Sequence, residues 1–183
     1  MQGGVHLGES REAFIRDVYQ PYHQDVYQYC LYFTNNIEEA NDLTQETFVK
    51  ALHSIGSFQG KSSTRTWIIS IARNTTIDFY RKRKFQRLLP EKWRREQPGD
   101  VVSPADLADK GADWEVLQLA LSSLKKDYRQ VVILRALKDF SVRETAEILG
   151  WTESKVRVTY HRALQKMKLS IGHDTEGVIF YEK

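Results

Sequence analysis

The chain has 183 residues, of which 41% are hydrophobic, and it can therefore bury one medium core or two small ones. The 27 lysines and arginines exceed the 24 aspartates and glutamates by only three, so overall charge alone does not indicate a nucleic-acid partner. The single cysteine, Cys30, excludes an internal disulfide and a cysteine-based zinc site, and it suits a reducing compartment.

The N-terminal stretch MQGGVHLGES lacks the cationic start and the hydrophobic run of a secretory signal. Elsewhere no apolar run approaches the roughly 18 residues that a membrane-spanning helix needs. We therefore expect a soluble, cytoplasmic protein without direct membrane insertion.

Valines and isoleucines recur at helical rather than alternating spacing, so strand signals are nearly absent and we predict an all-α protein. Residues 10–84 are expected to form one domain of three or four helices. Its breaks are predicted near Thr34–Asn36 and across Ser57–Ser63, where the helical period stops.

The stretch Thr66–Lys84, TWIISIARNTTIDFYRKRK, combines an apolar stripe, three aromatic residues and four consecutive cations. Helical spacing predicts that one row of its side chains lies in the core: Ile68, Ile71, Ala72, Thr75 and Phe79. The cations support two interpretations. Either they close the helix against the negative end of its dipole, with Asp78 pairing to Arg81 or Lys82, or they belong to a surface that holds a flat, anionic ligand. This stretch alone leaves both open.

Residues 85–113 contain three of the four prolines and nearly balanced charge, without a sustained period. This composition is typical of a flexible linker. About 29 residues reach at most ~95 Å at ~3.3 Å per residue and average about 30 Å when flexible.

Helical periodicity resumes at Trp114 and predicts a second, smaller domain over residues 114–170, with eleven basic and six acidic residues. Within it, Ser141–Leu164 divides at Gly150 into two short helices. The inward row of the first is predicted to be Val142, Thr145, Ala146 and Leu149. Thr152 can cap the second through its hydroxyl, and the stretch LKKDYRQVVILRALKDF supplies a supporting helix. The pattern predicts a helix–turn–helix, and we assign no role to residues 171–183.

The second helix of this motif carries a cationic outer face. Its buried row is predicted to be Val156, Tyr160, Ala163, Leu164 and Met167. We name its outward residues the recognition face: Ser154, Lys155, Arg157, Val158, His161, Arg162 and Lys166. Lysines can contact phosphates, arginines can bind guanine edges, and Val158 can contact a thymine methyl group. The plainer alternative is a helical hairpin with a solvated basic face.

Enzyme signatures are missing from the sequence. It contains no Gly-rich phosphate loop, HExxH pair or nucleophile elbow, and its five histidines are scattered. His23 and Cys30 do not make a metal site by themselves. We therefore expect that the chain is not an enzyme and that it has no catalytic residue, metal or cofactor.

Three motifs follow one another in a fixed order. They are DLTQETFVKAL (Asp42–Leu52), SFQGKSSTRTWIISIARNTTIDFYRKRK (Ser57–Lys84) and, after the linker, LKKDYRQVVILRAL (Leu124–Leu137) with the helix–turn–helix. Over residues 12–168 this order resembles the extracytoplasmic-function (ECF) branch of the bacterial sigma-70 factors. Details such as TESKVRVTYHR are most similar to sigma-X-type factors. The resemblance implies a transcription initiation factor that binds core RNA polymerase, directs it to specific promoters and promotes strand opening, in an envelope or extracytoplasmic stress response.

The resemblance also implies site residues in the first domain. On the helix predicted over Ile37–Leu52, the buried positions would be Ile37, Ala40, Thr47, Phe48 and Ala51. The opposite side, which we name the acidic face, would dock on core polymerase: Glu38, Asp42, Gln45, Glu46 and Lys50. The residues implied to recognise and melt the minus-10 element are Phe58, Gln59, Lys61, Ser62, Ser63, Trp67, Arg73, Asn74, Arg81, Lys82 and Arg83. Trp67 either closes a pocket for a flipped base or wedges the loop against the helix.

By the same resemblance the recognition face would read the minus-35 element as duplex promoter DNA. The family typically adds a protein partner, a membrane-anchored anti-sigma factor. One rival interpretation keeps the helix–turn–helix but makes the chain a DNA-binding regulator that acts without polymerase. It treats residues 10–84 as an effector or dimerisation domain.

Overall fold

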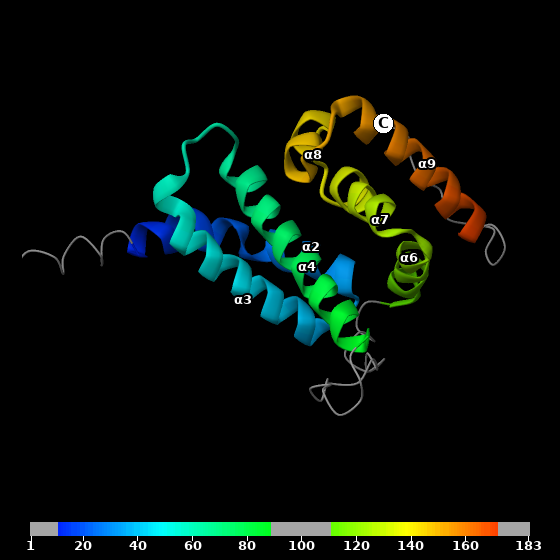
Figure 1. Cartoon of the computed structure of the whole chain (residues 1–183), viewed down its shortest axis with the longest axis horizontal. Helices are drawn as coiled ribbons and strands as arrows, with labels where there is room; N and C mark the ends of the chain where they lie inside the picture. The colour runs from blue at the N-terminus through cyan, green and yellow to red at the C-terminus, as the bar shows by residue number, and fades with distance from the viewer. Residues whose placement is uncertain (1–10, 89–110, 172–183) are drawn as a thin grey trace, which may run out of the picture. The chain divides into compact units, whose positions relative to one another are not determined.

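The computed structural model describes residues 11–88 and 111–171, the last two of each range by backbone alone. The interior of the predicted linker and the tail from residue 172 onward lie outside the described residues. The described chain is helical and contains no strand, as predicted (Figure 1). It divides into two compact units, Met1–Val102 and Ser103–Lys183.

The first domain contains three long helices. Its elements are η1 (Ile15–Tyr19), α2 (Gln20–Thr34), α3 (Ile37–Ser54), η2 (Ile55–Ser57) and α4 (Thr64–Leu88). Both predicted breaks are confirmed. Asn35 ends α2 in the left-handed conformation (φ 52°), and the Asn36 side chain caps α3 by accepting a 2.9 Å hydrogen bond from the backbone N–H of Glu39.

The core of this domain lies where α2, α3 and α4 pack against one another, so that α4 has neighbours on two sides (Figure 1). The predicted stripe on α4 is therefore only partly right. Ile68, Ala72 and Thr75 are buried, but Ile71 and Phe79 are partly exposed, and Ile69 and Thr76 are buried instead. Contact with two helices widens the buried face, whereas one apolar row anticipates a single contact. On α3, Leu43 and Thr44 are likewise buried beyond the predicted set, and Ile37 is partly exposed.

Two ion pairs hold α4 near its two ends. The Arg65 guanidinium lies 2.7 Å from the Asp25 carboxylate on α2, and the Arg83 guanidinium lies 2.5 Å from the Glu39 carboxylate on α3. The predicted end at Lys84 is wrong, because α4 continues without interruption to Leu88. The residues after Lys84 favour a helix, and the first proline that would disfavour one is Pro90.

The thiol of Cys30 is buried in this core. Burial raises its pKa to about 12, and hydrogen bonding with Thr44 and Thr76 lowers the pKa only in part. The folded thiol keeps its proton to higher pH than an unfolded one, so its contribution to the free energy of unfolding is complete below about pH 8.5 and is lost toward pH 12.

We expect Cys30 to be inert in the native protein, because the thiolate is the reacting form and the thiol is inaccessible. At pH 8 a disulfide-exchange reagent should label it at least about a hundredfold more slowly in buffer than in concentrated denaturant, as read by absorbance of the released thiol. Labelling at similar rates under both conditions would contradict this placement.

The second domain contains the helix–turn–helix. Its elements are α6 (Gly111–Ser123), α7 (Lys126–Val132), η5 (Ile133–Leu137), α8 (Val142–Leu149) and α9 (Glu153–Ile171). The linker was predicted to continue to Asp113, but α6 already begins at Gly111. Ser141 and Glu144 form a capping box at the start of α8, and Gly150 ends it in the left-handed conformation (φ 65°). Thr152 accepts a hydrogen bond from the backbone N–H of Lys155 at 3.2 Å, which confirms the predicted cap of α9.

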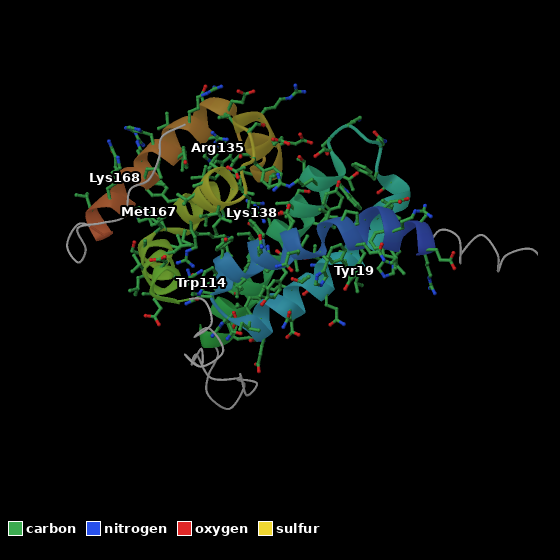
Figure 2. All side chains as sticks on the ribbon, turned by 180° about the vertical axis from the view of Figure 1, so that it is seen from behind. Tyr19, Trp114, Arg135, Lys138, Met167 and Lys168 are labelled. Carbon is green, nitrogen blue, oxygen red and sulfur yellow. The ribbon has the colours of Figure 1, made fainter. Side chains whose placement is uncertain are left out.

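The helix α9 is held by its predicted seam. Val156, Ala163 and Met167 are buried, whereas Tyr160 and Leu164 are partly exposed. Met167 is buried and the next residue, Lys168, is exposed. Figure 2 labels both residues on α9. Among the described helices, none is both long enough and apolar enough to cross a bilayer.

Candidate functional site

The recognition face on α9 is exposed. All seven of its residues lie in the exposed class, including Val158, an apolar side chain that is 50% exposed. They lie on α9, and α6, α7 and α8 all pack against this helix. The side chains therefore project from a rigid support, as a base-reading surface requires.

Several residues of the recognition face have partners on α9 or just before its start. The Arg157 guanidinium lies 2.8 Å from the Glu153 carboxylate, and the Lys155 ammonium lies 4.0 Å from the centre of the Trp151 ring. His161 and Gln165 are in hydrogen-bonding contact at 3.0 Å. Exposed pairs of this kind contribute only about 0.3–0.5 kcal/mol. Such weak pairs orient the side chains without holding them tightly.

The loop between η2 and α4 contains five of the eleven minus-10 candidates, and the other six lie on α4. Gln59 and Lys61 are exposed, Ser62 is partly exposed, and Gly60 adopts a positive φ of 66°. Phe58 stacks on Trp67 with ring centres 4.7 Å apart and planes inclined by 28°. This contact packs the loop against α4, as the wedging alternative for Trp67 predicts.

Ser63 caps the start of α4. Its hydroxyl accepts a 3.0 Å hydrogen bond from the backbone N–H of Thr66 and donates to the Thr66 hydroxyl at 2.9 Å. The residue thus satisfies an N–H of the first turn. The predicted base contact would have to compete with this cap.

The basic residues at the end of α4 do not all face the same way. Arg81 pairs with Asp78 at 3.1 Å, one of the two pairings predicted for that carboxylate, and its side chain remains 76% exposed. Lys82 is exposed, whereas the Arg83 side chain is 16% exposed and lies against Glu39. Arg83 is therefore directed toward α3 rather than toward solvent.

Upstream on the same helix, Arg73 donates a 2.9 Å hydrogen bond to the side-chain oxygen of Asn74, its neighbour in the predicted minus-10 set. Asn74 is exposed and Arg73 is partly exposed. Both side chains therefore reach the surface beside the loop-bearing half of α4.

Four of the five residues of the acidic face project from α3 into solvent: Glu38, Asp42, Gln45 and Glu46. Lys50 does not simply face outward. Its ammonium lies 2.7 Å from the Glu46 carboxylate and donates to the Thr75 hydroxyl on α4 at 3.2 Å. This lysine links α3 to α4 and neutralises part of the acidic face.

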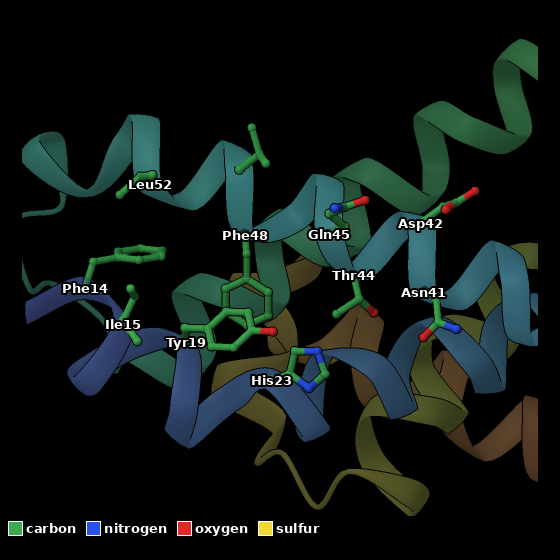
Figure 3. A pocket seen from close by; sticks show the side chains of 11 residues that line it. Phe14, Ile15, Tyr19, His23, Asn41, Asp42, Thr44, Gln45, Phe48 and Leu52 are labelled. Atoms are coloured by element: carbon green, nitrogen blue, oxygen red, sulfur yellow. The ribbon is translucent and has the colours of Figure 1, made fainter. Parts of the chain in front are cut away.

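An apolar groove adjoins the acidic face, between the η1–α2 segment and α3 (Figure 3). Asp42 and Gln45 stand at its rim. We define the groove by its lining residues: Phe14, Ile15, Tyr19, His23, Asn41, Asp42, Thr44, Gln45, Phe48, Val49 and Leu52. Tyr19 packs its ring edge-to-face on Phe48 with centres 4.8 Å apart.

No prediction from the sequence indicated this groove. Ile15 and Val49 leave 48% and 51% of their surface exposed, and Leu52 leaves 36%. The spacing of Val49 and Leu52, two apolar residues on the side of α3 away from the core, is the signal that could have indicated it. The η1 half of the groove had no comparable signal.

Comparison with known proteins identifies both domains. The family description Sigma-70 region 2 matches residues 18–86, and Sigma-70, region 4 matches residues 114–167. In Bacillus subtilis (strain 168), the RNA polymerase sigma factor YlaC is 38% identical over 165 residues, which cover 88% of this chain and 94% of that protein. The ECF RNA polymerase sigma factor SigX of the same strain is 37% identical over 155 residues, covering 82% and 80%.

Solved structures share the fold. The Bartonella quintana sigma factor RpoE, crystallised with the anti-sigma factor NepR, has a TM-score of 0.69 at 21% identity over 89% of this chain and 99% of that one. CnrH, solved with the cytosolic domain of CnrY, has a TM-score of 0.67 at 24% identity over 90% and 91%. On the family matches and the B. subtilis relatives, the chain belongs to the ECF branch of the sigma-70 RNA polymerase sigma factors.

Proposed function

We propose that this transcription initiation factor divides promoter recognition between its two domains. Through α9 it reads the minus-35 element as duplex DNA, and through the loop before α4 and the outward side of α4 it traps one strand of the minus-10 element. Unstacked bases are captured by aromatic or polar walls beside cations that hold the backbone. A linker of the expected reach allows both elements to be contacted at a separation of a couple of helical turns.

The observation that carries this proposal is the coexistence of two unlike exposed surfaces in one chain. The recognition face on α9 offers cations to DNA, and the acidic face on α3 offers carboxylates to a protein. A regulator that acts without polymerase would have to use the second surface for an effector or for dimerisation. We therefore place core polymerase on the acidic face, with the adjoining groove as its apolar continuation.

In this function the polymerase forms the RNA, and the sigma factor uses binding free energy to choose the promoter and to favour strand opening. It is not an enzyme, and it works in the cytoplasm. Because constitutive opening would be harmful, we also propose an anti-sigma partner, anchored in the membrane as in the family generally, and a role in an envelope stress response. The Bartonella quintana protein with this fold was crystallised with the anti-sigma factor NepR.

Run-off transcription tests the proposed function. Core RNA polymerase with the full chain should select a defined set of promoters from a randomised library, and neither component alone should do so. Duplex binding that is equally tight without core polymerase, combined with no directed transcripts, would favour the regulator instead.

Replacing Arg162 with alanine should relax promoter selection. If the exposed guanidinium of Arg162 binds a guanine edge, its loss should cost about 1–3 kcal/mol at one base pair of the upstream element and little elsewhere. The measurement is the affinity of holoenzyme for a set of fragments, each altered at one upstream position.

Arg157 supplies a comparison within the same helix. Because Arg157 already pairs with Glu153 at 2.8 Å, Glu153→Gln should release the guanidinium and remove a carboxylate that repels phosphate. Binding should then tighten a few-fold on every fragment.

For Arg162→Ala, an equal loss of affinity on all fragments would show a phosphate contact and would contradict base reading.

A further inference from the structure

Phe85 stands out on the first domain because a large aromatic side chain is 64% exposed there. The sequence placed it at the start of a flexible linker, but in the structure it belongs to α4, one turn after Arg81. It also lies within the residues that match Sigma-70 region 2. The ring is therefore carried by a continuous helix at a defined place rather than by a loose segment.

The surroundings of Phe85 are basic. Residues three and four apart share one side of a helix, so Lys82 and Arg81 are its neighbours, and Lys84 adjoins it in sequence. All three are exposed, and the nearest acidic residues along the chain are Asp78 and Glu91. The pairing of Arg83 with Glu39 turns the fourth cation of the run Arg81–Lys84 inward, and the other three cations of that run face outward around the aromatic ring.

This combination differs from an isolated exposed apolar residue, which by itself needs no explanation. Leu119 on α6 is exposed to a similar degree, 70%, but it is aliphatic and its helical neighbours are Glu115, Val116, Ser122 and Ser123. An aromatic face bordered by lysines and an arginine fits a single nucleic-acid strand, in which each base has a flat surface and each phosphate a charge.

We propose that Phe85 is a base-stacking residue for the opened promoter strand, with Arg81 and Lys82 holding the adjacent phosphates. The proposal rests on the proposed function, because it extends the strand-trapping surface of the first domain from the loop and the middle of α4 to the end of that helix. It assigns a contact to a residue outside the predicted minus-10 set.

The test uses holoenzyme made from core RNA polymerase and the full chain, on a promoter fragment that the wild-type holoenzyme has selected from a randomised library. Permanganate reactivity of unpaired thymines reports opening, and core affinity is measured separately. Phe85→Ala should reduce opening about tenfold at unchanged core affinity. Phe85→Trp and Phe85→Tyr keep an aromatic face and should open the promoter at about the wild-type level. Phe85→Leu keeps apolar bulk without an aromatic face and should open it as poorly as Phe85→Ala.

Leu119→Ala is the matched control and should leave opening and core affinity unchanged. Opening by Phe85→Ala or by Phe85→Leu at the wild-type level would overturn the stacking role. A loss of core affinity in Phe85→Ala, with normal opening per bound holoenzyme, would also overturn it and would place the ring against polymerase. If wild-type holoenzyme opens no fragment, the proposed function itself fails and this inference with it.

Discussion

Reversing the charges of Asp42 and Glu46 to lysine should abolish most binding to core polymerase. Both carboxylates are exposed on α3, and Asp42 stands at the rim of the apolar groove. Like charges brought together across an interface cost several kcal/mol, so we expect core affinity to fall about a hundredfold or more. Titration of labelled core with the variant measures the loss. Because Glu46 pairs with Lys50 only on the exposed surface, the fold should lose no more than about 0.5 kcal/mol.

A matched variant separates this effect from the change in net charge. Glu115→Lys with Asp127→Lys alters two exposed carboxylates of the second domain by the same total charge. It should bind core polymerase like the wild type. Equal affinity of both double variants for core would remove the acidic face from the proposed interface.

Replacing Arg83 with alanine should destabilise the first domain by about 2–4 kcal/mol. Its guanidinium lies 2.5 Å from the Glu39 carboxylate, and the two side chains are only 16% and 19% exposed. The substitution leaves a largely buried carboxylate without its cation, which is costlier than losing an exposed pair. Hydrogen exchange of the backbone amides of α3 and α4 in the full chain measures the stability of the first domain separately from that of the second.

Two further variants define the cause. Arg81→Ala removes a cation whose side chain is 76% exposed and paired with Asp78, and it should cost less than about 1 kcal/mol. The double variant Arg83→Met with Glu39→Leu removes both buried charges and should regain most of the stability lost in Arg83→Ala. Similar exchange in Arg83→Ala and Arg81→Ala would show that the buried pair is not a structural tie.

Local signals predicted most of the secondary structure correctly. The helical period gave the helices and the break at Thr34–Asn36, and Gly150 with Thr152 indicated the turn that joins α8 and α9. These features depend on residues within a few positions of one another, so one stretch of sequence contains the whole signal. The end of α4 was missed because the predicted linker was inferred from composition, and composition does not fix where a helix stops.

The candidate sites were predictable in outline only. Exposure of the recognition face followed from the period of a single helix, as α9 shows. The period could not indicate that Arg83 would pair with Glu39, 44 residues away, or that Lys50 would reach Thr75, 25 residues away. Such pairs depend on which flanks of α3 and α4 come into contact.

By itself, the sequence determined that this chain is helical, that it has two domains, and that one of them contains a helix–turn–helix, because these follow from local periodicity and capping. Only the tertiary structure decided which cations face solvent and that Trp67 stacks on Phe58. The reason is that helix packing joins residues far apart in the chain, and the side chains it leaves exposed are those that can meet polymerase and DNA.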